Sequence, residues 1–344
     1  VMISVQMLLD GVSAFLERRA QAHRTIVARM MVGEHSSAAP AGEYKKGASM
    51  RTTCSSRRYV GVLLATLVAF EGAAAQSAAT QGRQVGEATS HDGVRIAYEV
   101  RGDDSTALVF VHGWSCDRTY WREQIELFAQ DFTVVAVDIA GHGESGVGRE
   151  HWTIQAFGAD VAAVAEKLAL KNLVLIGHSM GGDVIVEAAR RLPGRVTGLI
   201  WVDTYRQIGT PRTQEDIDAM LAPFRRDFVN TTRTFVRGMF MPGADPELVG
   251  WVAADMSAAP PPIALGALQA AISFDRVIPS ALQELKLPVI ALNGTWRATD
   301  AESLKGHGVR VVIMQEAGHF PMLEDPKRFN ALLRRTIADV RSER

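Results

Sequence analysis

A serine at the centre of residues 177–181 has the surroundings of an enzymatic nucleophile. The pattern Gly-His-Ser-Met-Gly follows the apolar run 173–176 and precedes a stretch typical of a helix, so it predicts a strand, a sharp turn and a helix. Glycines on both sides of Ser179 leave room where strand and helix nearly collide, and the turn holds the hydroxyl away from the sheet. The backbone N–H of Met180 begins the helix and points toward negative charge that develops beside the serine.

His319 has the position and the chemistry of the base that such a serine needs. A serine hydroxyl is a weak nucleophile at neutral pH, and it requires a base together with a third group that orients the base. His319 follows the last apolar run, 309–313, in a loop that contains Gly318. Because histidine titrates near neutral pH, we expect His319 to accept the proton of the serine.

Two aspartates are candidates for the group that orients the base. Asp203 stands at the tip of the predicted strand 196–202, whereas Asp300 lies several residues beyond the predicted strand 288–293. A residue at a strand tip has the better fixed backbone, so the sequence favours Asp203. Asp300 remains the alternative, and either side chain could instead cap a helix or a turn.

The loop after the predicted strand 107–111 supplies a second oxyanion donor. The N–H of Trp114 is expected to face the same point as that of Met180, with the indole lining the pocket. His112, at the end of the strand, is expected to brace this loop through hydrogen bonds. His178, beside the nucleophile, is expected to point away from the site.

The order of apolar runs predicts the elements that position these residues. Continuous apolar runs, typical of strands buried on both faces, alternate with helical patterns, and a hairpin is predicted at 85–101. Such alternation implies a doubly wound α/β fold with a mostly parallel sheet, whose functional residues gather at the carboxyl ends of the strands. The predicted parallel strands are 107–111, 132–138, 173–177, 196–202, 288–293 and 309–313.

Residues 205–286 interrupt the alternation and are too long for an ordinary connection. Their pattern predicts an inserted helical cap with helices at 214–228, 231–240, 246–256 and 263–274. Most of its large apolar side chains should form the cap's own core, and about a third should face the substrate. The large apolar side chains of the predicted cap, nine in all, are Met220, Phe224, Phe228, Phe235, Met239, Phe240, Met241, Trp251 and Met256.

The amino-acid composition and net charge of the chain limit the kinds of molecule that it could bind. The chain has 344 residues, of which 47% are hydrophobic and 22% charged, as in globular proteins. Lys and Arg number 37 against 38 acidic residues, and the resulting net charge of −1 provides no field for nucleic acid or an anionic membrane. The two cysteines, Cys54 and Cys116, form neither a metal-binding nor a disulfide pattern. We therefore expect a small, largely uncharged substrate.

Residues 50–75 have the features of a secretory signal peptide: a basic segment, a short apolar run and small residues up to Ala75. The apolar run is short for a bilayer span, so we expect cleavage near Ala75 and no stable membrane insertion afterwards, with an uncleaved anchor as the alternative. Residues 1–49 are then an upstream extension. The predicted hydrolytic core comprises 76–204 and 287–344, in a periplasmic or extracellular protein.

Four segments together resemble the α/β-hydrolase superfamily, in its capped branch with a serine nucleophile. The resemblance covers residues 93–340, and it implies that Ser179 is the nucleophile, His319 the base, and Trp114 and Met180 the oxyanion donors. The segments that carry it, in the family's order, are 112–114, 138–145, 177–182 and 318–320.

The chain departs from this family at the acid. Many relatives have Gly-x-x-Asp after the penultimate strand, where this chain has Gly-Thr-Trp-Arg at 294–297. The departure favours Asp203 as the acid, at a position that some lipase-like members use. A serine rather than an aspartate at position 179 argues against epoxide hydrolase or dehalogenase activity.

The sequence thus predicts a secreted serine hydrolase that cleaves a small or medium uncharged carboxylic ester through an acyl-enzyme. Its partner would be a small-molecule substrate, and the reaction would need no metal or organic cofactor. A lactonase, a carbon–carbon bond hydrolase or a cofactor-free perhydrolase would use the same residues. A non-catalytic binding protein could also share the fold.

Overall fold

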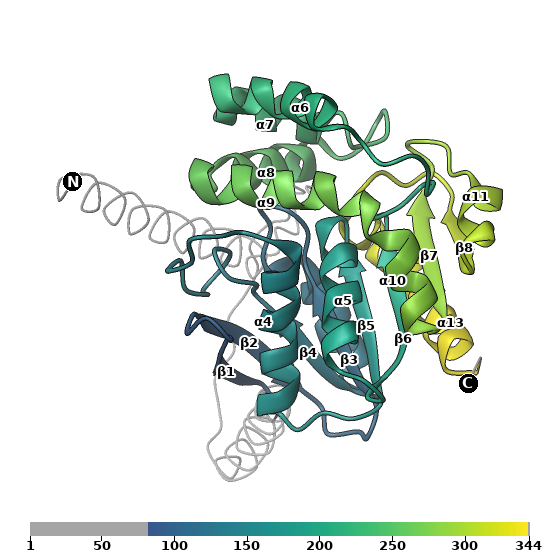
Figure 1. The fold of residues 1–344 in the computed structure, drawn as a ribbon. Coiled ribbons are helices and arrows are strands. Elements are labelled where there is room, and N and C mark those ends of the chain that lie inside the picture. The colour runs from purple at the N-terminus through teal and green to yellow at the C-terminus, as the bar shows by residue number, and fades with distance from the viewer. Residues whose placement is uncertain (1–81, 343–344) are drawn as a thin grey trace, which may run out of the picture. The chain divides into compact units, whose positions relative to one another are not determined.

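The computed structural model describes residues 82–342, and these residues form an eight-stranded sheet with helices on both faces (Figure 1). The strand order is β1-β2-β4-β3-β5-β6-β7-β8; β1 and β2 form the antiparallel hairpin at the edge, β2 pairs antiparallel with β4, and all other pairs are parallel. The α/β fold with a mostly parallel sheet is confirmed. The strands are β1 (Gln84–Thr89), β2 (Arg95–Arg101), β3 (Ala107–Val111), β4 (Thr133–Val137), β5 (Leu173–His178), β6 (Val196–Val202), β7 (Val289–Gly294) and β8 (Val309–Met314).

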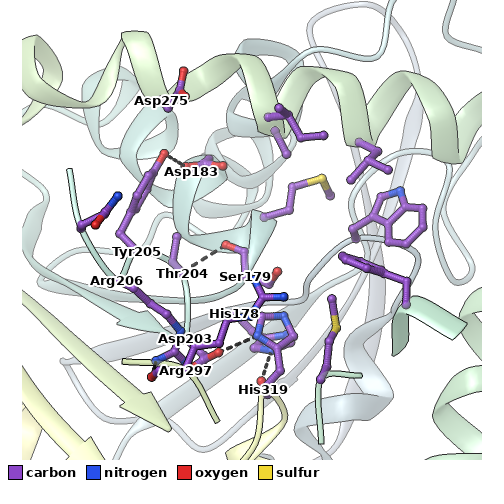
Figure 2. Close-up of a pocket in the computed structure, with 18 of the residues that line it drawn as sticks. His178, Ser179, Asp183, Asp203, Thr204, Tyr205, Arg206, Asp275, Arg297 and His319 are labelled. Carbon is purple, nitrogen blue, oxygen red and sulfur yellow. Dashed lines mark hydrogen bonds and ion pairs between the residues drawn. The ribbon is translucent and has the colours of Figure 1, made fainter. Parts of the chain in front are cut away.

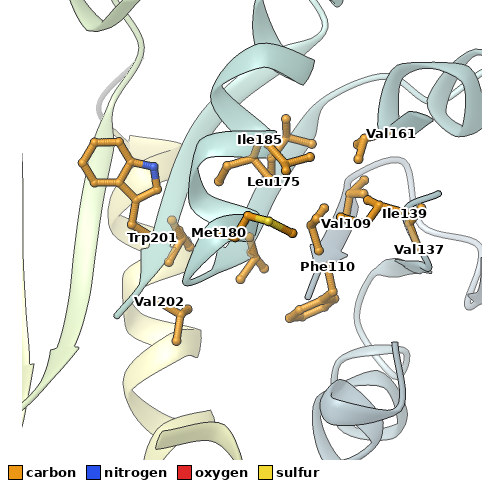
Figure 3. Close-up of a cluster of buried hydrophobic side chains, with 14 of the residues drawn as sticks. Val109, Phe110, Val137, Ile139, Val161, Leu175, Met180, Ile185, Trp201 and Val202 are labelled. Carbon is orange, nitrogen blue, oxygen red and sulfur yellow. The ribbon is translucent and has the colours of Figure 1, made fainter. Parts of the chain in front are cut away.

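The central strands are buried along their whole length because helices cover both faces. In register, Val109 of β3 faces Val135 of β4 on one side and Leu175 of β5 on the other. The cluster in Figure 3 packs such strand residues against Met180 and Ile185 of the helix that follows β5. The helices are η1 (Arg118–Trp121), α3 (Arg122–Phe128), α4 (Ile154–Lys167), α5 (Met180–Arg191), α11 (Ala301–Gly306), α12 (Pro321–Glu324) and α13 (Pro326–Ser342).

The segment between β6 and β7 is helical, and its first four helices lie beside the carboxyl edge of the sheet (Figure 1). The predicted gap between the first two helices is wrong, because Asp227 ends one helix and caps the next, accepting a hydrogen bond from the N–H of Asn230. A fifth helix, which was not predicted, packs against α5. The helices are α6 (Gln214–Arg226), α7 (Phe228–Arg237), α8 (Pro246–Ser257), α9 (Pro261–Ser273) with η2 (Phe274–Arg276), and α10 (Ile278–Leu285).

The two N-terminal predictions, the extension 1–49 and the signal peptide 50–75, lie outside the described residues. Within 82–342, no helix combines the length and the apolar character that crossing a bilayer requires. The division into a hydrolytic core and a cap stays a prediction.

Candidate active site

Ser179 occupies a strained turn between β5 and α5. Its backbone has φ 52° and ψ −122°, a region that residues other than glycine rarely adopt. The turn is so tight that a Cβ atom at Gly177 would lie 2.2 Å from the carbonyl oxygen of Gly181. A Cβ atom at Gly181 would lie 2.5 Å from the carbonyl oxygen of Val111. Both positions therefore require glycine, and Met180 is the first residue of α5, where backbone N–H groups have no intrahelical partner.

Asp203 directly follows β6 and gathers four hydrogen-bond donors. Its Oδ2 accepts from Nδ1 of His319 at 2.6 Å and from the indole N–H of Trp296 at 2.7 Å. Its Oδ1 accepts from the backbone N–H of Gly294 at 2.9 Å and from the guanidinium of Arg206 at 2.5 Å. The carboxylate is therefore held between two loops and points at the imidazole.

These partners keep Asp203 ionised although its side chain is fully buried. Burial alone would raise the pKa of this carboxyl group, because a low-dielectric environment disfavours charge. The hydrogen bond and the charge of His319 outweigh burial, with further help from Arg206 and Trp296, so the pKa of Asp203 is lowered from its usual value.

The loop that carries His319 follows β8 and is fixed through its backbone. The N–H of His319 donates to the carbonyl oxygen of Met239, just after α7, at 2.8 Å. The carboxylate of Glu324 accepts from the N–H groups on either side, those of Gly318 at 2.8 Å and Phe320 at 3.1 Å. Three backbone N–H groups thus anchor this loop, one to the helical segment and two to Glu324 of α12.

Asp300, the alternative acid, is engaged elsewhere. Its side chain accepts a hydrogen bond from the N–H of Ser303 at 2.9 Å and caps α11. Its own N–H donates to the carbonyl oxygen of Arg206 at 2.8 Å. Of the two aspartates, the structure brings Asp203 to His319.

His178 contacts the site, so the expectation that it points away is wrong. Its Nε2 donates to the carbonyl oxygen of His319 at 2.7 Å, and the two ring centroids are 4.7 Å apart. The loop after β8 passes across the end of β5 and brings this carbonyl group to the ring. Burial, and secondly the positive charge of His319, lower the pKa of His178 to about 3. The ring is therefore neutral at physiological pH and supports the backbone of its neighbour.

A cavity of about 620 Å³ brings Ser179, Asp203 and His319 together (Figure 2). Trp114 and Met180 also line it, and the indole of Trp114 donates to the carbonyl oxygen of Ala264 on α9 at 2.7 Å. Four of the nine large apolar side chains singled out in the helical segment line the cavity, close to the share expected from the sequence: Met220, Phe235, Met239 and Met256.

The first loop is braced from within. His112 donates through Nδ1 to the carbonyl oxygen of Gly113 at 2.8 Å, and its Nε2 accepts from the N–H of Ile139 at 3.3 Å. This agrees with the bracing role expected for His112. Cys116 is buried, donates through Sγ to the carbonyl oxygen of Trp114 at 3.3 Å and lines the cavity. Within the described residues, no group of three or more His, Cys, Asp or Glu side chains is placed to hold a metal ion.

Sequence reasoning missed three residues that support the histidine and its acid: Arg206, Trp296 and Glu324. One signal was available, because Trp296 stands in the segment where many relatives carry their acid. The acid is absent from that segment, and the segment instead supplies the Trp296 donor to the acid at position 203. Arg206, three residues after Asp203, had no such signal.

Comparisons with known proteins identify what the chain is similar to. The model of the alpha/beta hydrolase family matches residues 108–332. A thermophilic esterase from Thermogutta terrifontis has a similar structure, with a TM-score of 0.63 and 26% identity, covering 75% of this chain and 99% of the esterase. Non-heme chloroperoxidase from Streptomyces lividans is 37% identical over 121 residues, 34% of this chain.

Two of the curated relatives match over less than half of their own length. The match covers 44% of that chloroperoxidase. It covers 30% of the dihydrolipoyllysine-residue acetyltransferase component of the acetoin cleaving system from Cupriavidus necator, with 32% identity over 111 residues, 32% of this chain.

Proposed function

Because the chain belongs to the alpha/beta hydrolase family, we propose that it is a serine hydrolase that cleaves a carboxylic ester through an acyl-enzyme on Ser179. The observation that carries the proposal is the 2.6 Å hydrogen bond between Nδ1 of His319 and Asp203, beside a serine that lines the same cavity. With Nδ1 engaged, Nε2 of the imidazole is the nitrogen that takes the serine proton.

The proposed reaction has two halves. Oγ of Ser179 attacks the ester carbonyl carbon while its proton moves to His319, and the oxyanion receives hydrogen bonds from the N–H groups of Met180 and Trp114. When the carbon–oxygen bond breaks, His319 gives the proton to the departing alkoxide. Water then gives a proton to His319 and attacks the acyl-enzyme. When the bond between the acyl carbon and Oγ breaks, the acid is released and His319 returns that proton to Oγ, which restores the serine. Asp203 holds the imidazole and stabilises its cationic form.

The apolar part of the cavity lining supports a small or medium substrate with an apolar acyl group. Methionine and phenylalanine side chains from the helical segment form one wall, as expected of a cap that shapes an apolar pocket. The net charge of −1 provides no long-range attraction for a charged polymer. The signal-peptide pattern of residues 50–75 supports export of the enzyme.

Replacement of the nucleophile tests this proposal. We expect Ser179→Ala to lose turnover of p-nitrophenyl esters and labelling by a fluorophosphonate probe, while the matched variant Ser280→Ala, which changes an exposed helix serine, keeps both. A panel of acyl chain lengths, lactones, carbon–carbon substrates and peroxide then separates esterase activity from its alternatives. Labelling that persists in Ser179→Ala would show that another residue is the nucleophile.

A further inference from the structure

Asp183 places a carboxyl group in the cavity wall one helical turn beyond Ser179. Its side chain lies on the first turn of α5, lines the cavity and is only 5% exposed. Oδ1 accepts a hydrogen bond from the hydroxyl of Tyr205 at 2.7 Å. No residue within 82–342 donates a hydrogen bond to the second oxygen, Oδ2. A buried carboxyl group that faces a cavity with one unused oxygen calls for an explanation.

Another buried aspartate in the same protein shows what a purely structural carboxyl group looks like. Asp160 accepts hydrogen bonds from both terminal nitrogens of Arg149, at 2.5 and 3.0 Å, and from the hydroxyl of Ser90 at 2.5 Å. It also accepts from the N–H of Ala140 at 3.0 Å. Both of its oxygens and its charge are therefore satisfied within the fold, which distinguishes it from Asp183.

Asp183 lies near other polar groups of the cavity lining. Asp275 also lines the cavity and forms an ion pair with Arg212 at 2.9 Å, so polar groups gather on this side (Figure 2). In Figure 2 the hydroxyl of Tyr205 meets the carboxyl group of Asp183 between Ser179 and Asp275. Apolar side chains line the cavity as well, among them Trp114, whose ring packs edge-on against that of Phe235.

We propose that Asp183 binds a hydroxyl group carried by the ester substrate, so that the enzyme prefers hydroxylated esters to plain ones. The inference rests on the proposed function and names its substrate class more closely. A site built to hydrogen-bond a hydroxyl rejects the analogue that lacks it, because the buried polar group is then left without a partner.

The protonation state of Asp183 favours a hydroxyl over a charged group. Burial raises the pKa of this carboxyl group to about 8, with the negative charge of Asp275 adding to the effect and the hydrogen bond from Tyr205 opposing it. At pH 7 the group is then a neutral acid that can donate and accept, and a hydroxyl does the same.

The test compares matched esters on the same protein. For p-nitrophenyl hexanoate and its 3- to 6-hydroxy analogues, we expect the wild type to show kcat/KM at least about 10-fold higher for one hydroxylated position. In Asp183→Leu that ratio should fall to about 1, whereas Asp183→Asn, which keeps a donor and an acceptor, should retain part of it. Ser280→Ala serves as the control and should keep the full ratio. A merely structural role would lower the melting temperature and leave the ratio unchanged, which would overturn the inference.

Binding without turnover separates this inference from the proposed function. Ser179→Ala is titrated by calorimetry with methyl hexanoate and with its 3- to 6-hydroxy analogues. Tighter binding of a hydroxylated ester, lost in the double variant with Asp183→Leu, supports the inference even where the wild type turns over no ester. Equal affinities, or a preference for a 6-amino ester in the wild type, would overturn it while ester turnover stands.

Discussion

Asp138 and Asp203 hold equivalent places in the sheet and have different partners. Each directly follows a buried parallel strand, β4 or β6, and each is almost inaccessible to solvent. Asp138 forms an ion pair with the guanidinium of Arg118 and accepts hydrogen bonds from the N–H groups of Arg118 at 2.7 Å and Glu144 at 2.8 Å. Asp203 likewise pairs with a guanidinium, that of Arg206, and in addition it meets the imidazole of His319 at 2.6 Å.

The partner decides what each carboxylate can do. A guanidinium group keeps its charge at every physiological pH, so the Asp138 pair can only hold its loop together. An imidazole gains and loses a proton near neutral pH, so a carboxylate beside it can support proton transfer. The distant segment that the fold brings to a strand-end aspartate thus decides whether its carboxylate can only hold a loop or can also support a base.

Asp203→Asn should produce the largest effect, because it removes the charge that supports the imidazolium form. We expect kcat for a p-nitrophenyl ester to fall by about 10⁴-fold. The matched variant Asp300→Asn should stay within about twofold of the wild type, since asparagine also caps helices well. A large loss confined to Asp300→Asn would reverse the assignment of the acid.

Arg118→Met should lower the free energy of unfolding and leave catalytic turnover unchanged. It leaves the carboxylate of Asp138 buried without its counter-charge, and we expect the free energy of unfolding in urea to fall by about 3–5 kcal/mol. Turnover per active site, counted by fluorophosphonate labelling, should be retained. The control Arg334→Met breaks an exposed pair with Asp131 and should cost no more than about 1 kcal/mol. Equal losses in the two variants would contradict the structural role of the Arg118 pair.

Lowering the pH should produce a smaller effect, a loss of stability that is specific to Asp203. Its pKa is lower in the folded protein than the usual 3.8, so its interactions contribute stability that is present above 3.8 and is lost as pH falls through the folded value. The stability difference between wild type and Asp203→Asn should therefore shrink from pH 5 to pH 3 in urea unfolding. A difference that stays constant, or grows, would show that the carboxylate is not stabilised in its ionised form.

The fold was predictable because its strands are continuous apolar runs between helical patterns. Burial on both faces leaves little choice of residue, and β3 to β8 appear where such runs occur. Helix α10 was missed because it has only eight residues, and its partner α5 is distant in sequence. The boundary at Asp227 depends on one residue that ends α6 through its backbone N–H and caps α7 through its side chain, which periodicity does not reveal.

The candidate site was predictable where local patterns determine it and less so where loops meet. Ser179 and His319 belong to short motifs, and their catalytic roles stay predictions for the variants above to test. Asp203 was favoured over Asp300 from its place at a strand tip. Its donors Arg206 and Trp296 come from two loops whose mutual arrangement no local pattern specifies. His178 was misread for the same reason, since its partner is a backbone carbonyl from a distant loop.

The hydrogen bond from the N–H of His319 to the carbonyl oxygen of Met239 has a consequence for protein engineering. The helices between β6 and β7 look like a module that could be exchanged among related enzymes to alter substrate range. Any such chimera must reproduce a backbone acceptor at position 239, or the transplanted segment will change substrate range and reaction rate together. Grafts that preserve the chain around Met239 are therefore the ones in which selectivity can be redesigned by itself.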